Sequence, residues 1–199
     1  MLYMLSSSTN TFRLIEFDFQ SSTDYMAFQE GRSLLNEAVM LKYRIEKKAA
    51  FDKLKKSHFI ESTGPQLVSS RLREALSEEE SRGEVQFFEV DIESDHGHLN
   101  DVFAMNVTHR IACTDMARSE AKLSNFDPAN PEYDFYYQVL LPEFDSPPDM
   151  RIAICDEMPR MAVVSEVLLS RFSQAKLNGL ILYSALDMTT WDRSVCVKL

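Results

Sequence analysis

Two stretches of this 199-residue chain carry the same pattern, and the repeat limits the folds that the chain can adopt. Residues 66–90 (QLVSSRLREALSEEESRGEVQFFEV) and 162–185 (AVVSEVLLSRFSQAKLNGLILYSA) align without a gap. Matching residues stand at offsets 0, 3, 7, 14 and 18: Ser69, Leu72, Leu76, Gly83 and Phe87 in the first copy, and Ser165, Leu168, Phe172, Gly179 and Tyr183 in the second. Offsets of 0, 3 and 7 place side chains on one face of a helix.

The flanking residues predict how each copy begins and ends. A serine ahead of an apolar-periodic run is typical of a helix N-cap, and a glycine after it is typical of the left-handed C′ position. Val-rich residues before the serine and aromatic residues after the glycine indicate strands. Each copy is therefore predicted to form a strand, a helix of roughly three turns and a strand. We expect Ser165→Ala to cost roughly 0.5–2 kcal/mol of stability through the lost cap.

The remaining pattern predicts an α+β fold with mixed sheets and short helices. A chain of this length suits a single domain over 1–199, with pseudo-symmetric halves at about 1–110 and 111–199 as one arrangement. Strands are predicted at 11–19, 39–46, 85–92, 102–109, 134–141 and 150–155. Residues 47–57 are interpreted as a short basic helix or a solvated loop, and residues 115–123 as a short helix capped by Asp115. Loops are predicted at 25–36 (with a helical turn around Gly31), 93–101, 124–138 and 142–149, and the tail after Ser184 has weak periodicity.

Charge is unevenly spread along the chain. The net charge is -10, yet residues 42–56 hold seven Lys/Arg against two acids, whereas residues 84–157 hold sixteen acids against four Lys/Arg. This balance disfavours nucleic-acid binding, which needs an excess of positive charge. An acidic middle section can complement a basic partner, although acidic surface also serves solubility alone.

Nothing in the sequence predicts a membrane or secretory protein. No apolar run reaches the roughly 18–20 residues that span a bilayer, and the first residues lack the basic start and cleavage site of a signal peptide. The cysteines, Cys113, Cys155 and Cys196, are far apart in the chain and form no CxxC pair. We therefore expect reduced thiols in a cytoplasmic protein.

The sequence shows no catalytic constellation, and we predict neither a catalytic residue nor a cofactor. Ser69 and Ser165 lack the GxSxG context of a nucleophile and are interpreted as caps. His96 and His98, in a predicted loop, are too few for a zinc site without a second cluster, so no metal site is predicted. A metal-dependent hydrolase that uses these two histidines stays an alternative.

The order and spacing of these motifs resemble a known family. The chain is similar to the immunity proteins of bacterial polymorphic toxin systems, in particular the eleventh-numbered immunity family. The resemblance covers roughly residues 39–185 and rests on QLVSSRLREAL, the aromatic strand VQFFEVDI, FAMNV at 103–107, Asp115 with Ser119, and AVVSEVLLSRF with its closing Gly179 to Tyr183. Where family members carry a Leu/Ile-Phe-Arg step, this chain has Cys155 and Asp156.

The resemblance implies a protein that binds and neutralises one cognate toxin. Toxins paired with this family include nucleases, which present a basic surface that an acidic protein can occlude. We expect toxin contacts between and around the two repeats, from acids in the predicted loops and their edges: Glu132, Asp134, Glu143, Asp145 and Asp149. An adaptor or chaperone for a secreted effector is the alternative from another class, and the oligomeric state is left open.

Overall fold

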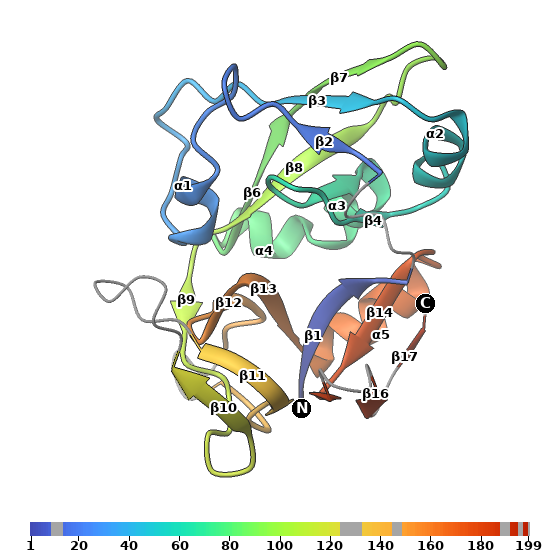
Figure 1. The fold of residues 1–199 in the computed structure, drawn as a ribbon. Coiled ribbons are helices and arrows are strands. Elements are labelled where there is room, and N and C mark those ends of the chain that lie inside the picture. Colours follow the sequence, from blue (N-terminus) through green and yellow to red (C-terminus); the bar gives the residue numbers. More distant parts are fainter. Residues whose placement is uncertain (9–13, 124–132, 145–148, 188–191, 195–196, 199) are drawn as a thin grey trace.

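The computed structural model describes residues 1–8, 14–123, 133–144, 149–187, 192–194 and 197–198 (Figure 1). Its helices are short: α1 (Met26–Gln29), α2 (Lys48–Leu54), α3 (Ser70–Ala75), α4 (Ser77–Ser81) and α5 (Glu166–Gln174). Mixed parallel and antiparallel sheets make up most of the regular structure, which confirms the predicted α+β class. No helix in these ranges is both long and apolar enough to cross a membrane.

Each repeat contributes its strands to a different sheet. The upper sheet in Figure 1 has the order β4 (Phe59–Ile60), β5 (Leu67–Ser69), β8 (Val102–Val107), β6 (Val85–Glu89). The lower sheet has the order β17 (Val197–Lys198), β14 (Leu180–Tyr183), β1 (Leu2–Ser7), β13 (Met158–Ser165), β12 (Ile152–Cys155), β9 (Arg110–Ile111).

The two repeats share one topology, a β-α-β unit whose parallel strands are separated by a third strand. In the first repeat, β5 and β6 both pair antiparallel with β8, which lies between them. In the second, β13 and β14 both pair antiparallel with β1. An antiparallel neighbour also precedes each unit, β4 beside β5 and β12 beside β13. In the first unit the central strand, β8, follows the unit in sequence, whereas in the second it is β1, from the N-terminus. Strand β1 therefore packs with residues beyond the boundary predicted near residue 110. The division into halves itself stays a prediction.

The predicted apolar faces of both repeats meet in one core. Leu72 and Leu76 from the first repeat, and Leu168 and Phe172 from the second, are fully buried. They pack in a single cluster with residues of both sheets, such as Val68 and Val164. Because each helix buries its apolar face between the two sheets, the units stabilise one another.

Two further sheets cover the outer faces. Strands β2 (Glu16–Phe17), β3 (Lys42–Ile45) and β7 (Asp91–Ser94) enclose a second core with α1 and α2. The alternation predicted for 39–46 is confirmed, since Leu41, Tyr43 and Ile45 are buried and Arg44 is exposed. Strands β10 (Glu120–Leu123), β11 (Tyr133–Val139), β15 (Ala185–Asp187) and β16 (Asp192–Ser194) form the last sheet. Leu186 of β15 and Leu140, directly after β11, enter a third core on the lower sheet.

Several predicted elements are wrong in extent or type. The strand at 85–92 breaks at Val90, because β6 pairs with β8 whereas β7 joins β3 in another sheet. The helix at 115–123 is a turn followed by β10, whose backbone pairs with β11 instead; Asp115 still accepts a hydrogen bond from the Arg118 amide, at 3.2 Å. The turn expected around Gly31 is helix α1, which ends before it.

Other predictions hold in part. Of the strand predicted at 11–19, residues 11–13 lie outside the described residues and only Glu16–Phe17 is strand. The loop predicted at 124–138 is outside the described residues up to 132, and from Tyr133 onward it is strand β11. The basic helix predicted at 47–57 is confirmed as α2, and the three-turn helix of the first repeat is divided at Leu76 into α3 and α4.

The helix ends of the two repeats differ from the predicted symmetry. Ser69 and Ser165 both occupy N-cap positions with nearly identical extended backbones. Ser69 Oγ accepts from the Leu72 amide at 3.3 Å, whereas the buried Ser165 Oγ has no hydrogen-bond partner in the part of the chain that the structure describes. The predicted Ser165 cap is therefore wrong as a hydrogen bond, although its position is right.

We expect the two serines to respond differently to alanine. Ser69→Ala removes a satisfied cap and should lower the free energy of unfolding by about 1 kcal/mol. Ser165→Ala removes an unsatisfied buried hydroxyl and should leave stability nearly unchanged. Urea unfolding of the two variants, followed by circular dichroism, compares them directly, and equal losses would contradict the assignment.

The C-terminal helix stops also differ. Gly83, with φ of +75°, is the C′ residue of α4, and the Glu84 amide donates to the Glu79 carbonyl at 2.9 Å to close the turn. In the second repeat the equivalent residue is Lys176, with φ of +49°, and the Leu177 amide donates to Phe172. Gly179 lies three residues beyond, so its predicted role as the helix stop is wrong.

Lys176 is strained in this left-handed conformation, which glycine adopts without cost. We expect Lys176→Gly to raise the free energy of unfolding by about 0.5–1 kcal/mol, the relief of strain less the entropy cost of glycine. Lys176→Ala is the matched control, because it removes the same charge but keeps the Cβ. An equal rise in the free energy of unfolding of the alanine variant would show that the lost charge, and not the backbone conformation, causes the effect.

A buried carboxylate ties the two units together. Glu79 on α4 is fully buried and accepts from Arg171 Nη1 on α5 at 2.6 Å and from Arg151 Nη1, before β12, at 3.3 Å. Arg151 and Arg171 also contact exposed Glu78. The hydrogen bond from Arg151 holds the pKa of Glu78 below its ordinary value, so its stabilisation is present at neutral pH and is lost as the pH falls through that lowered pKa.

Removal of Glu79 should be costly, because it leaves two arginines with one exposed partner. We expect Glu79→Ala to lower the free energy of unfolding by about 3 kcal/mol. Glu78→Ala is the control, and its effect should be much smaller because that carboxylate is solvated. Thermal unfolding at neutral pH measures both, and a Glu79 variant as stable as the Glu78 variant would contradict this role.

Candidate functional site

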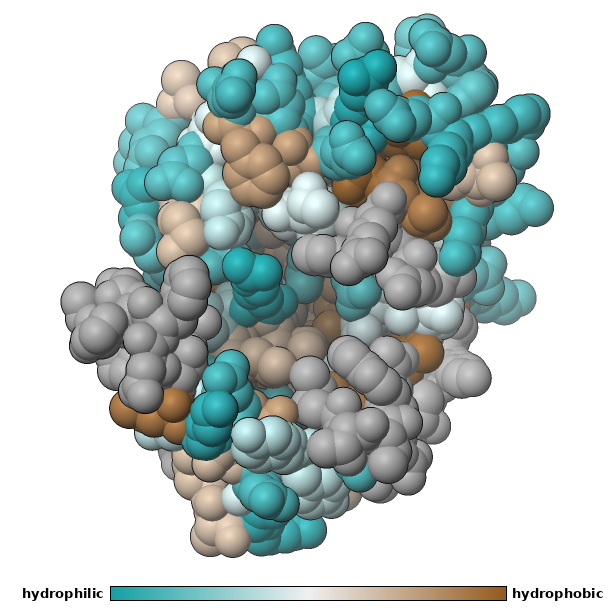
Figure 2. Space-filling model, in the orientation of Figure 1, coloured by the Kyte–Doolittle hydropathy of each residue, from teal (hydrophilic) through white to brown (hydrophobic). Residues whose placement is uncertain are grey.

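A cleft separates the two repeated units on one face of the molecule. The space-filling view shows a hollow between the upper and lower halves (Figure 2). Its cavity volume is about 230 Å³. The loop after β4, residues 61–66, forms one side with α1, and residues 159–162 of β13 form the other.

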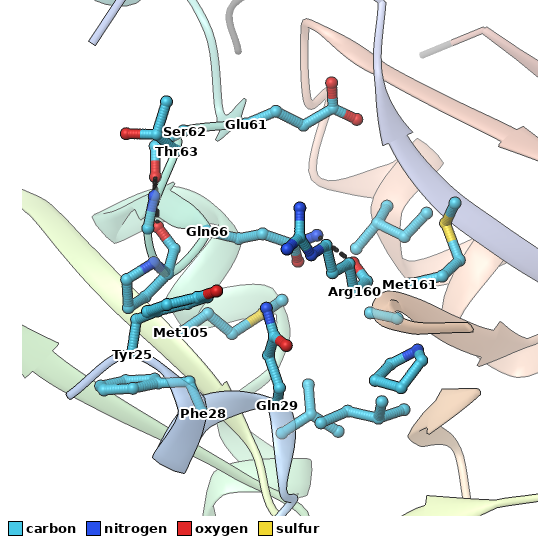
Figure 3. Close-up of a pocket in the computed structure, with 17 residues that line it drawn as sticks. Tyr25, Phe28, Gln29, Glu61, Ser62, Thr63, Gln66, Met105, Arg160 and Met161 are labelled. Carbon is cyan, nitrogen blue, oxygen red and sulfur yellow. Dashed lines mark hydrogen bonds between the residues drawn. The ribbon is translucent and has the colours of Figure 1, made fainter. Parts of the chain in front are cut away.

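The cleft combines apolar walls with a few polar groups (Figure 3). Tyr25, Phe28 and Met105 line one wall, and Met161 lies across from them. Gln66 Nε2 spans the gap and donates to the Arg160 carbonyl at 3.1 Å. Such a lining suits the insertion of a side chain or loop from another molecule.

Polar groups of the loop beside the cleft hold the backbone. Glu61 Oε1 accepts from Ser6 Oγ at 2.7 Å and from the Ser7 amide at 3.1 Å. Ser62 Oγ donates to the Pro65 carbonyl at 2.7 Å, and Thr63 Oγ1 accepts from the Phe17 amide at 3.0 Å. These contacts assign the polar groups a structural role.

The structure brings His58 to Ser69, a pairing that the sequence does not indicate. His58 Nδ1 and Ser69 Oγ lie 2.7 Å apart. Burial, and then the charge of Arg71, lower the pKa of His58, which favours a neutral ring that accepts from the hydroxyl. Since the same Oγ also accepts from the Leu72 amide, the pair supports the helix cap.

The two histidines of the hydrolase alternative lie in different surroundings. His96 Nε2 lies 2.9 Å from the Glu46 carbonyl oxygen, and its ring contacts Phe51. His98 lines a polar recess over β2, β3 and β7 with charged side chains such as Asp18 and Lys42. Within the described ranges neither histidine joins a group that could hold a metal ion.

The acids predicted to bind toxin are spread over the lower half, as far as they are described. Asp134 is exposed on β11, where it pairs in register with Lys122 of β10, and Glu143 is exposed beyond the end of that strand. Asp149 is 71% exposed and contacts Arg82 Nη2 at 2.8 Å. Glu132 and Asp145 lie outside the described residues.

Asp134 has interface-like neighbours. Tyr136, two residues along the same face of β11, is 42% exposed. Exposed tyrosine is enriched in protein-binding surfaces. We call Lys122, Asp134 and Tyr136, which share one face of the two paired strands, the hairpin face.

A cluster of two thiols and a carboxylate was not predicted. Cys113, Cys155 and Glu157 place their ligand atoms within 4.8 Å of one another. Both thiols are fully buried, and a hydrogen bond with Cys155, together with burial, raises the pKa of Cys113. Cys113 follows β9 and Cys155 ends β12, so only the parallel pairing of these strands joins residues so far apart in sequence.

A comparison with protein families gives one match. The model of the immunity protein family Imm11 matches residues 16–187. No curated protein matches the chain.

Proposed function

The chain belongs to the immunity protein family Imm11, and from this premise we propose that it binds one cognate toxin of a polymorphic toxin system and neutralises it in the cytoplasm, without catalysis. The match covers most of the chain, including both repeats. That breadth is the observation that carries the proposal, because most of the scaffold, and not an isolated motif, matches the family.

The acidic segment supports a basic toxin surface as the target. Residues 84–157 hold sixteen acids against four Lys/Arg, and Asp134 and Glu143 are exposed. A nuclease that binds nucleic acid presents such a basic surface, and a carboxylate-rich protein that covers it blocks the substrate. The tyrosine of the hairpin face supplies apolar contact area beside the charge of Asp134.

Charge reversal tests this surface. The variant Asp134→Lys/Glu143→Lys/Asp149→Lys should bind the toxin encoded beside its gene at least about tenfold more weakly, with a shallower salt dependence. The control Glu16→Lys/Glu46→Lys/Glu74→Lys makes the same change in net charge at exposed acids outside the acidic segment. Titration calorimetry at two salt concentrations measures both variants.

The outcomes separate the competing surfaces and functions. Equal affinities for the wild type and both variants would contradict the acidic surface. If the variant Gln29→Glu/Arg160→Glu lowers the affinity for the toxin instead, the result would assign the toxin contact to the cleft. Toxin that is bound but fully active in the complex would indicate the adaptor or chaperone function, because an immunity protein must abolish that activity.

A further inference from the structure

The thiol–carboxylate cluster has the donors of a metal site. Cys155 Sγ lies 3.2 Å from Glu157 Oε2, and the same oxygen accepts from the Cys113 amide at 3.3 Å. The donor atoms are close enough to be shared by one small ion, since each lies within 4.8 Å of the others. Two thiolates with a carboxylate favour a thiophilic cation such as Zn²⁺ over Mg²⁺ or Ca²⁺.

The strands hold these donors in place. The Ile154 amide donates to the His109 carbonyl at 2.8 Å and the Asp156 amide to the Ile111 carbonyl at 3.0 Å, which secures β12 against β9. The Leu141 amide donates to the Cys113 carbonyl at 2.9 Å, which secures Cys113 to the chain beyond β11. Sites built on such elements are preorganised.

A buried amide lies beside the thiols. Gln138 on β11 is fully buried, and its Oε1 has no hydrogen-bond partner among the described residues. Its Nε2 lies 3.7 Å from Cys155 Sγ and 2.9 Å from Thr114 Oγ1. A half-turn of the amide exchanges Nε2 with Oε1. It brings the carbonyl oxygen next to Cys155 Sγ, with the Thr114 hydroxyl as its donor, and moves Nε2 to the position that Oε1 leaves.

We propose that Cys113, Cys155 and Glu157, completed by the Gln138 carbonyl oxygen, form a structural zinc site. The ion joins β9, β11 and β12, and so fastens the outer sheet of β10, β11, β15 and β16 to the lower sheet. Glu157 is only half-buried and provides the route of entry, whereas the thiols are enclosed. Binding of Zn²⁺ replaces the two thiol protons, which leave to solvent, and no electron is transferred.

Metal loading of the whole protein tests this site. Protein purified under reducing conditions and dialysed against Zn²⁺ should hold one ion per chain, and its Tm should rise relative to protein treated with chelator. Co²⁺ in place of Zn²⁺ should produce a thiolate-to-cobalt charge-transfer band. About two protons per ion should be released in weak buffer at neutral pH, one from each thiol.

Matched variants locate the ion. Cys113→Ser/Cys155→Ser should lose the charge-transfer band and the Tm response, whereas Cys196→Ser should keep both. Glu157→Gln should weaken binding by about tenfold or more while the fold is retained. The cobalt spectrum of the wild type needs no variant, so the test remains valid if the double variant does not fold.

The opposite results would overturn the site. These are wild-type protein without a thiolate–cobalt band or a Zn²⁺-dependent Tm, the same metal content in the double variant, or a disulfide between Cys113 and Cys155 that persists under reducing conditions.

Discussion

The contact of Glu79 with Arg171 and Arg151 joins the two repeated units, and the rest of the architecture depends on it. Glu79 is fully buried on α4 of the first unit, Arg171 belongs to α5 of the second, and Arg151 lies directly before β12. A buried carboxylate is tolerated only where cations and hydrogen bonds replace water. Its charge therefore specifies how α4 meets α5, and the shared apolar core closes around this arrangement.

The repeat leaves the molecule with one core shared by both units and with two surfaces of different chemistry. The cleft between the units is walled by aromatic and methionine side chains, whereas the lower half displays exposed carboxylates, with Tyr136 on the same face as Asp134. The repeated units supply stability, and surface residues outside their buried faces remain available for partner choice.

The two repeats have the same structural features only where packing requires them. Both serines start their helices with the same backbone, yet only Ser69 completes the cap, because its hydroxyl faces the Leu72 amide and the His58 ring. Both helices close with the same hydrogen-bond pattern, yet Gly83 serves one and Lys176 the other. Both repeats bury their apolar helix face, because that face forms part of the core that they share. The buried residues are Leu72, Leu76, Leu168 and Phe172.

From the sequence alone, periodicity determined the helix faces, the strands around them and the α+β class, because these depend on neighbours a few residues apart. The family came from a resemblance in the order of its motifs, which the match over residues 16–187 supports. Tertiary structure decided what distant residues do. The insertion of β1 between β13 and β14, the pairing of β10 with β11 in place of a helix, and the meeting of Cys113 with Cys155 all arise from strand pairing across long separations. Backbone hydrogen bonds satisfied by a remote strand outweigh local propensity, and no local pattern records which strand that is.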